Sequence, residues 1–226
     1  LWKACDAQVG DDFHINPEEI EKKYFGVLTK LFNVARFASQ FDVPSDLDTV
    51  PEGLHIEDKW IFSEFQSTMN EVESSWKNLD IYSATQALKA FGTGVLPSHY
   101  LEMVKSRLYD DDEMAAWTIH RVVRDFLSAF SPICPFFSHH ISSTIYGKSS
   151  VEIDSFPQNA IPEVGLDTEY GNKLRSLTSI IQTFNSEVWS TKKENGISLN
   201  QPITGITIPS EIEEFSSVFT RMHKLE

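Results

Sequence analysis

Cations, an amide and an aromatic ring recur at helical spacing early in the chain. Residues 17–40 have the periodicity of an amphipathic helix. At about 100° per residue, the outward face carries Lys23, Lys30, Asn33 and Phe37, with Arg36 beside them. An aromatic ring flanked by cations suits stacking on an unpaired nucleic-acid base with phosphate contacts nearby. Alternatively, Phe37 is simply covered by the loop after residue 41 or by another helix. The opposite, apolar stripe consists of Ile20, Tyr24, Leu28, Leu31, Ala35 and Ala38.

Four further cations could contact a polyanion. Lys105 and Arg107 lie in another amphipathic segment and are weaker candidates, because they could equally be surface cations whose stems cover apolar neighbours. Lys192 and Lys193 close the last long helical segment. They could bind phosphate or simply complement the negative end of the helix dipole.

Motifs that carry catalysis are absent from the sequence. There is no glycine-rich phosphate loop, no Gly-x-Ser-x-Gly elbow and no His-Glu-x-x-His metal motif. His139 and His140 are adjacent, so on a helix they point about 100° apart and form no chelate. Cys5 and Cys134 lack metal-ligand spacing, and we interpret them as reduced thiols of a cytoplasmic protein. We therefore expect no catalytic residue, metal or cofactor in this chain.

The charge of the chain restricts its partners. The net charge of −14 over 226 residues argues against binding nucleic acid by general electropositivity. Residues 1–113 hold 21 acidic and 10 basic side chains (net −11), and residues 114–226 hold 12 and 9 (net −3). Any surface that binds a polyanion must therefore be local. No apolar run reaches membrane-spanning length, so we expect no membrane partner. Because the first residue is not Met, we interpret the sequence as part of a longer chain.

The segments that position these side chains are mostly helical. Asn16 and Pro17 are suited to begin the first helix, and the acidic run 110–113 is suited to cap the fourth. In the third, Gly92, Gly94 and Pro97 predict a kink or break between about residues 91 and 98, with regular helix again by Tyr100. The expected helices span about 17–40, 57–79, 80–108 with this interruption, 113–131, 135–146, 167–192 and 210–222.

The pattern changes after Gly147. Residues 150–157 look extended, and residues 195–209 predict one or two short strands between the last two helices. The expected fold is mainly α: an antiparallel helical bundle over residues 1–147, followed by a small α+β appendage over residues 148–226.

Several stretches resemble one protein family. "YLEMVKSRLY", residues 100–109, resembles the signature segment in the helical anticodon-binding domain of valyl-tRNA synthetases, which are class I aminoacyl-tRNA synthetases. Other stretches resemble the same family in the same order, and together they span essentially the whole chain. They are "LWKACDAQVGDDF", "LTKLFNVARF", "IEDKWIFSEF", "FSPICPFFSHHISSTIYG", "SVEIDSFP" and "KKENGISLNQPI".

The resemblance implies a tRNA-binding region. In the family the bundle holds the anticodon stem-loop, and the aromatic residue matching Phe37 is placed to stack in that loop. The expected partner is therefore valine tRNA, with no DNA partner. Valine anticodons end in A and C, and Asn33 and Arg36 are possible readers of these bases. The family's two ATP-handling motifs do not occur in this chain, so ATP would be used by an upstream catalytic domain, and we expect no valine activation by this chain alone.

The sequence also departs from the family. "FGTGVLPS", residues 91–98, replaces a stretch that usually carries Trp and Phe, with Thr93 and Leu96 in their places. This divergence and the charge of −14 leave an alternative open: a non-catalytic scaffold module that derives from the same fold and has lost tRNA binding.

Overall fold

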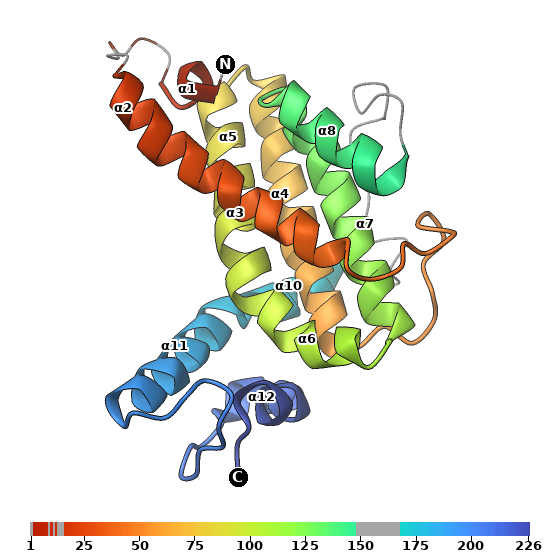
Figure 1. Ribbon diagram of the computed structural model, residues 1–226, viewed down its shortest axis with the longest axis vertical. Coiled ribbons are helices and arrows are strands. Elements are labelled where there is room, and N and C mark those ends of the chain that lie inside the picture. The colour runs from red at the N-terminus through yellow and green to blue at the C-terminus, as the bar shows by residue number, and fades with distance from the viewer. Residues whose placement is uncertain (1, 9, 11, 13–15, 148–167) are drawn as a thin grey trace.

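Helices make up nearly all of the regular structure. The computed structural model describes residues 2–8, 10, 12, 16–147 and 168–226 (Figure 1). No helix in these ranges combines the length and the apolar character needed to cross a membrane. The elements are α1 (Trp2–Cys5), α2 (Pro17–Glu19), η1 (Ile20–Tyr24), α3 (Phe25–Ala38), α4 (Ile56–Lys77), α5 (Ile81–Ala90), η2 (Phe91–Tyr100), α6 (Leu101–Tyr109), α7 (Glu113–Phe130), α8 (Pro135–Tyr146), α10 (Thr168–Ser176), α11 (Thr178–Glu194), η3 (Ser210–Phe215) and α12 (Ser216–His223).

The first long helix begins as its sequence predicts. Asn16 Oδ1 accepts a hydrogen bond from the Glu18 backbone N–H at 3.0 Å, and Pro17 occupies the first turn. The chain then stays helical to Ala38, but η1 winds as a π-helix. Ile20, predicted to lie in the buried stripe, does not share it with Tyr24. Ile20 is 36% exposed, whereas Tyr24 is buried.

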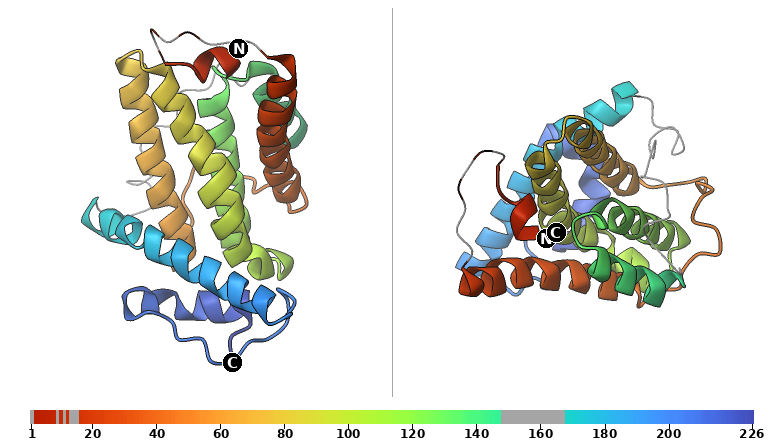
Figure 2. Two further views of the ribbon diagram at one scale, coloured as in Figure 1. Left: turned by 90° about the vertical axis from the view of Figure 1, so that its left-hand side faces the viewer. Right: turned by 90° about the horizontal axis from the view of Figure 1, so that it is seen from above.

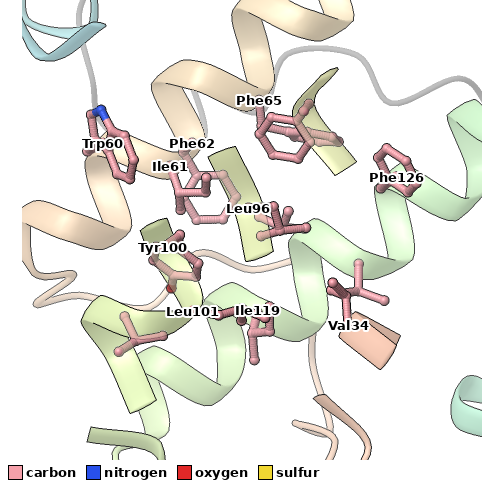
Figure 3. Close-up of a cluster of buried hydrophobic side chains, with 14 of the residues drawn as sticks. Val34, Trp60, Ile61, Phe62, Phe65, Leu96, Tyr100, Leu101, Ile119 and Phe126 are labelled. Carbon is pink, nitrogen blue, oxygen red and sulfur yellow. The ribbon is translucent and has the colours of Figure 1, made fainter. Parts of the chain in front are cut away.

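The body of the bundle is formed by α4, α7 and the helical run α5–η2–α6. In Figure 1, α3 crosses in front of this body. It packs on α7 and η2, and α8 packs on α7. The core between these helices is aromatic and aliphatic (Figure 3). Its labelled members, all buried, are Val34, Trp60, Ile61, Phe62, Phe65, Leu96, Tyr100, Leu101, Ile119 and Phe126.

The predicted interruption of the third helix is a π-helix, not a break. η2 covers Phe91–Tyr100, and the Leu101 N–H donates to the Leu96 carbonyl, five residues back. Pro97 has no N–H, and its ring would clash with the carbonyl four residues earlier in an α-helix. The wider winding accommodates it without ending the helix. Regular α-helix resumes at Leu101, one residue after the position expected.

Gly92 marks the point where η2 passes closest to its neighbours. A Cβ at this position would lie 2.6 Å from Phe126 Cζ and 2.7 Å from Leu31 Cδ2. A side chain there would push apart α3, η2 and α7, so the glycine sets the depth at which α3 sits on the bundle.

The C-terminal part adds helices, not a sheet. α10 packs on α4 and α12 packs on α6, and α11 runs below the bundle in the left view of Figure 2. The strands predicted at 195–209 are wrong: within the described residues this part holds only an isolated bridge between Ile203 and Leu225. The expected extended stretch at 150–157 lies outside the described residues, as does the start of the appendage at 148.

Candidate functional site

The outward side of α3 carries unpaired polar groups. Lys30, Asn33 and Arg36 are exposed, and the side chains of all three lack a hydrogen-bond or ion-pair partner among the described residues. From Lys22 to Phe41 the sequence contains four cations and no carboxylate. In a chain of net charge −14 this is a locally positive surface, and its polar side chains are available to a ligand.

Lys23 lies on the same helical run but has an internal partner. Its Nζ is 2.6 Å from Asp6 Oδ2, and the Tyr24 hydroxyl donates to the same oxygen at 2.8 Å. Burial acts to raise the pKa of Asp6, but hydrogen bonds from Lys23, Tyr24 and Gln86 outweigh it and lower that pKa. Lys23 therefore holds the N-terminal segment against η1, and its charge is partly neutralised.

Phe37 is half-buried rather than freely exposed. Its ring lies 5.3 Å from that of Phe41 and 6.3 Å from that of Tyr109, both edge to face. Tyr109, at the end of α6, is itself 63% exposed. The covering predicted as the alternative, by the residues after 41 or by another helix, is therefore partly realised. Part of the ring remains open to solvent.

Two exposed aromatic residues on α3 were not among the predicted candidates. Phe25 is 68% exposed and Phe32 is 43% exposed, although both belong to the helix that packs on the core. The signal that could have found them is their spacing of seven residues, which repeats one position of the helix surface outside the apolar stripe. We call Phe25, Lys30, Phe32, Asn33 and Arg36 together the α3 face.

Lys105 and Arg107 have different environments although both lie on α6. Lys105 is partly exposed and forms an ion pair with Glu102, one turn earlier. Arg107 is only 4% exposed, so the prediction that it offers its charge to RNA is wrong. The reason is a set of carboxylates that its sequence neighbourhood only partly reveals.

Arg107 joins three helix ends. Its Nη1 lies 3.0 Å from Glu57 Oε1, its Nη2 lies 2.9 Å from Asp58 Oδ2, and its Nε lies 2.9 Å from Asp112 Oδ2. Glu57 and Asp58 begin α4, and Asp112 caps α7 by accepting from the backbone N–H groups of residues 114 and 115. Glu57 also accepts a hydrogen bond from Arg221 of α12 at 3.1 Å. One guanidinium thus fixes the lower end of the bundle.

Burial and charge oppose each other in this network. Burial acts to lower the pKa of Arg107, but the carboxylates of Asp112, Asp58 and Glu57 outweigh it and raise that pKa. Burial raises the pKa of Asp58, and the attraction of Arg107 counters this only in part. The guanidinium therefore stays charged, and burial favours the protonated form of Asp58 once its partner is removed.

Lys192 and Lys193, at the end of α11, have different environments. Lys192 is fully buried, and its Nζ donates to the carbonyls of Leu199, Gln201 and His223 at 2.7–2.8 Å. The prediction that Lys192 contacts RNA is therefore wrong, because all three of its donors are used inside the protein. Burial lowers its pKa. Lys193 is exposed and its side chain has no partner among the described residues, so it stays a candidate.

The described residues hold no group of three or more His, Cys, Asp or Glu side chains placed to bind a metal ion. The chemistry that the α3 face offers is instead recognition. Two cations can contact phosphates, an amide can pair with base edges, and two exposed rings can stack.

The sequence is similar to regions of known tRNA ligases. Residues 58–208 match the family described as the anticodon-binding domain of tRNA ligase. The valine–tRNA ligase of Saccharolobus solfataricus is 34% identical over 200 residues, which cover 88% of this chain and 23% of that protein. The valine–tRNA ligase of Aeropyrum pernix is 29% identical, with 99% of this chain and 27% of that protein covered. That of Methanothrix thermoacetophila is 31% identical, with 94% and 23% covered. The chain spans about a quarter of the length of these relatives.

Proposed function

The chain belongs to the anticodon-binding domain family of tRNA ligases, and on that premise we propose that it is the tRNA-binding region of a valine–tRNA ligase. Its role is to hold valine tRNA so that the acceptor end reaches a catalytic region outside this chain. ATP and valine would be used by that region.

The observation that carries this proposal is the charge of the α3 face. RNA binding depends on phosphate contacts, and each contact requires a cation that is not already paired. Lys30 and Arg36 meet this requirement, whereas Arg107 and Lys192 do not. Asn33 lies between the two cations on the exposed surface, where its amide can read a base edge.

Lys105 and Lys193 would make outer contacts. Both are accessible, but Lys105 shares its charge with Glu102, and Lys193 lies on α11 rather than on α3. We expect each to contribute less than Lys30 or Arg36, because a paired or isolated surface cation adds little to a specific complex.

The proposed specificity for valine tRNA rests on the anticodon bases A and C. Asn33 and Arg36 lie three residues apart on α3, so their side chains are neighbours on the helix surface. Together they present both donors and an acceptor to Watson–Crick edges. The scaffold alternative rested partly on the divergent segment 91–98, which was expected to break the third helix. Because that segment continues the helix as η2, this reason for the alternative no longer holds.

A binding titration tests the proposal. The 226-residue chain should retain valine tRNA on a filter more tightly than a noncognate tRNA at the same salt concentration. Lys30→Ala and Arg36→Ala should each lower the slope of log affinity against log salt by about one, as expected for one lost phosphate contact. Lys77→Ala is the matched control: it removes an exposed cation, paired with Glu73 on α4, and should leave the slope unchanged.

Two results would contradict the proposal. Equal affinity for valine and noncognate tRNA would remove the specificity, and equal slopes for all three variants would show that RNA binds elsewhere. Either result would return the scaffold function to consideration.

A further inference from the structure

A buried amide connects the bundle to the helices below it. α11 and α12 lie below the bundle in Figure 1, and Asn185 of α11 is fully buried. Its Nδ2 lies 3.2 Å from Nδ1 of His99 on η2, and its Oδ1 lies 2.8 Å from Nε2 of His223 on α12. Trp189, one turn after Asn185, also contacts both imidazole rings. We call His99, Asn185, Trp189 and His223 together the joint.

The amide fixes which atoms of the joint donate and which accept. Asn185 Nδ2 can only donate, so His99 Nδ1 accepts and carries no proton. Asn185 Oδ1 can only accept, so His223 Nε2 carries a proton. His99 is therefore neutral in this arrangement. A proton added at His99 Nδ1 would set two donors against each other and break that hydrogen bond.

When the pH falls, a proton reaches His99 before His223. His99 is partly exposed, whereas His223 is 1% exposed. Burial lowers the pKa of His99. For His223 the nearby charge of Lys192 adds to burial, and its pKa falls to about 4. Lys192 is in turn affected by the charge of Lys224. Neither imidazole forms an ion pair with a carboxylate among the residues that the structure describes.

The ring of Trp189 favours a charged His99. The two ring centroids are 5.8 Å apart and the planes are inclined by only 29°, so the imidazole lies over the face of the indole. The face of an indole attracts a cation within about 6 Å. The nearest carboxylate along η2 and α6, Glu102, is paired with Lys105. A positive charge on His99 is therefore stabilised by an aromatic ring and not by a counter-ion.

We infer that Asn185 is the pivot of a proton-dependent switch between the bundle and the helices α11 and α12. When His99 takes up a proton at Nδ1, the Asn185 amide turns over. Its Oδ1 then accepts from His99 Nδ1–H, and its Nδ2 donates to His223 Nε2. His223 releases the proton of Nε2 to water and takes one from water at Nδ1. The joint gains one proton in all, at His99, and the inference does not depend on the proposed function.

Turning the amide over costs less than opening the joint. The oxygen and the NH₂ group of an asparagine are so similar in size that they can exchange places in the same space. If the amide stayed as it is, its buried NH₂ group would lose its acceptor, and a buried donor without an acceptor is costly. After the amide has turned, both hydrogen bonds of Asn185 are kept.

Nuclear magnetic resonance of the imidazole nitrogens in the whole 226-residue chain tests the switch, because each tautomer has its own pair of nitrogen shifts. His99→Gln and His223→Gln assign the signals. Above pH 6.5, the usual pKa of histidine, both rings should be neutral with the proton on Nε2. As the pH falls below this value, His99 should become doubly protonated. With the same midpoint, His223 should change to the Nδ1–H tautomer and stay neutral.

Replacing the amide by a carboxylate should lock the switch. In Asn185→Asp the side chain keeps its shape but can only accept, so it can bind His99 Nδ1–H and His223 Nε2–H together. The midpoint of the His99 titration should rise by about 1–3 pH units, and His223 should keep its proton on Nε2. Asn195→Asp, at the exposed end of α11, is the matched control and should leave both titrations unchanged.

Trp189 provides a second measurement. An imidazolium ion stacked on an indole quenches its fluorescence. The difference in fluorescence between the wild type and Trp189→Phe, in which the other four tryptophans cancel, should therefore fall as His99 is protonated. In His99→Gln the corresponding difference should not change with pH over this range, because the glutamine does not titrate.

The wild-type titration decides the matter even if a variant fails to fold. If His223 keeps its proton on Nε2 while His99 titrates, the amide does not turn over and the switch is overturned. A neutral His99 with its proton on Nδ1 would show that the amide already has the other orientation, which also overturns it. An unchanged His99 midpoint in folded Asn185→Asp would show that residue 185 does not bind His99.

Discussion

Removing Arg107 should destabilise the protein more than removing any exposed cation. In Arg107→Met the side chain keeps most of its length, but Glu57 and Asp58, which are 1% and 0% exposed, lose the guanidinium that they share. Asp58 retains hydrogen bonds from the Tyr100 hydroxyl at 2.9 Å and from the His55 backbone N–H at 3.1 Å. These two bonds solvate the carboxylate but do not neutralise it.

The expected cost follows from that geometry. Breaking a buried ion pair on one side typically costs about 3–5 kcal/mol, because the remaining charge is buried without compensation. We expect the lower half of this range, since Glu57 keeps Arg221 and Asp58 keeps its two hydrogen bonds. Against a total stability of about 5–15 kcal/mol for a folded domain, such a loss is large.

Urea unfolding followed by circular dichroism measures this loss, with stability extrapolated linearly to water. Lys105→Met, two residues earlier on the same helix, is the matched control and should cost at most about 1 kcal/mol, as exposed ion pairs do. Adding Asp58→Asn to Arg107→Met should recover part of the loss, because it removes the charge left uncompensated. If Arg107→Met costs no more than Lys105→Met, the guanidinium is not buried as the structure has it and the reasoning fails.

Two further predictions concern packing and pH. Gly92→Ala should cost about 1–3 kcal/mol in the same urea assay, because its Cβ would overlap Phe126, whereas Gly94→Ala, with open space around it, should be neutral or stabilising by up to about 1 kcal/mol. Equal effects at the two glycines would contradict the close packing. His223 Nε2 donates to Asn185 Oδ1 at 2.8 Å, and burial lowers the pKa of His223 to about 4. In the unfolded chain His223 protonates near pH 6.5, whereas in the fold it stays neutral down to about pH 4. Its contribution to the free energy of unfolding is therefore fully present above pH 6.5, and roughly 3 kcal/mol of it should be lost as the pH falls from 6.5 to 4. His223→Gln should lose correspondingly less over this range, and identical pH profiles of the two proteins would refute the assignment.

The helices could be predicted because their signals are local. Asp112 caps α7 as the acidic run suggested, with hydrogen bonds of 2.9 and 3.0 Å to backbone N–H groups. Asn16 and Pro17 likewise begin the first helix. Caps and 3.6-residue periodicity involve residues within a turn or two of each other, so the sequence displays them directly. The interruption at η2 also has a local signal in Pro97, whereas the π-winding of η1 was not predicted, and Ile20 at its start is 36% exposed instead of buried.

The failed strands have a specific cause. Residues 195–209 contain the alternating apolar pattern of a strand, but their backbone carbonyls are used differently. Lys192 Nζ donates to the carbonyls of Leu199 and Gln201, so the segment wraps around a buried ammonium group instead of pairing in a ladder. Ile203 then forms its single bridge to Leu225. A buried lysine that organises a loop leaves no periodic signal in the sequence.

For the candidate site too, the sequence predicts what local periodicity determines but not what contacts with distant residues determine. Exposure of Lys30, Asn33 and Arg36 follows from the helical wheel of α3 alone, and the structure agrees. Arg107 looks equally accessible on the wheel of α6, but two of its partners lie about fifty residues earlier at the start of α4. Sequence therefore identifies a cation on an outward position, whereas only the tertiary structure shows whether a carboxylate meets it there.

This division is consistent with the proposal that an acidic chain offers a surface for RNA. Carboxylates that would repel phosphate are placed where they cap helices or neutralise buried cations, as Asp58 and Asp112 do around Arg107. Such carboxylates act over short range, because salt at physiological concentration screens charges beyond about 8 Å. The run from Lys22 to Phe41 contains none of them, so a phosphate at the α3 face meets Lys30 and Arg36 first. In the proposed complex, local charge governs binding at this face. The net charge of −14 adds a repulsion that weakens as salt rises, and this opposes the loss of affinity from the two phosphate contacts. The measured salt slope for the wild type should therefore be shallow, close to the value for two or three phosphates.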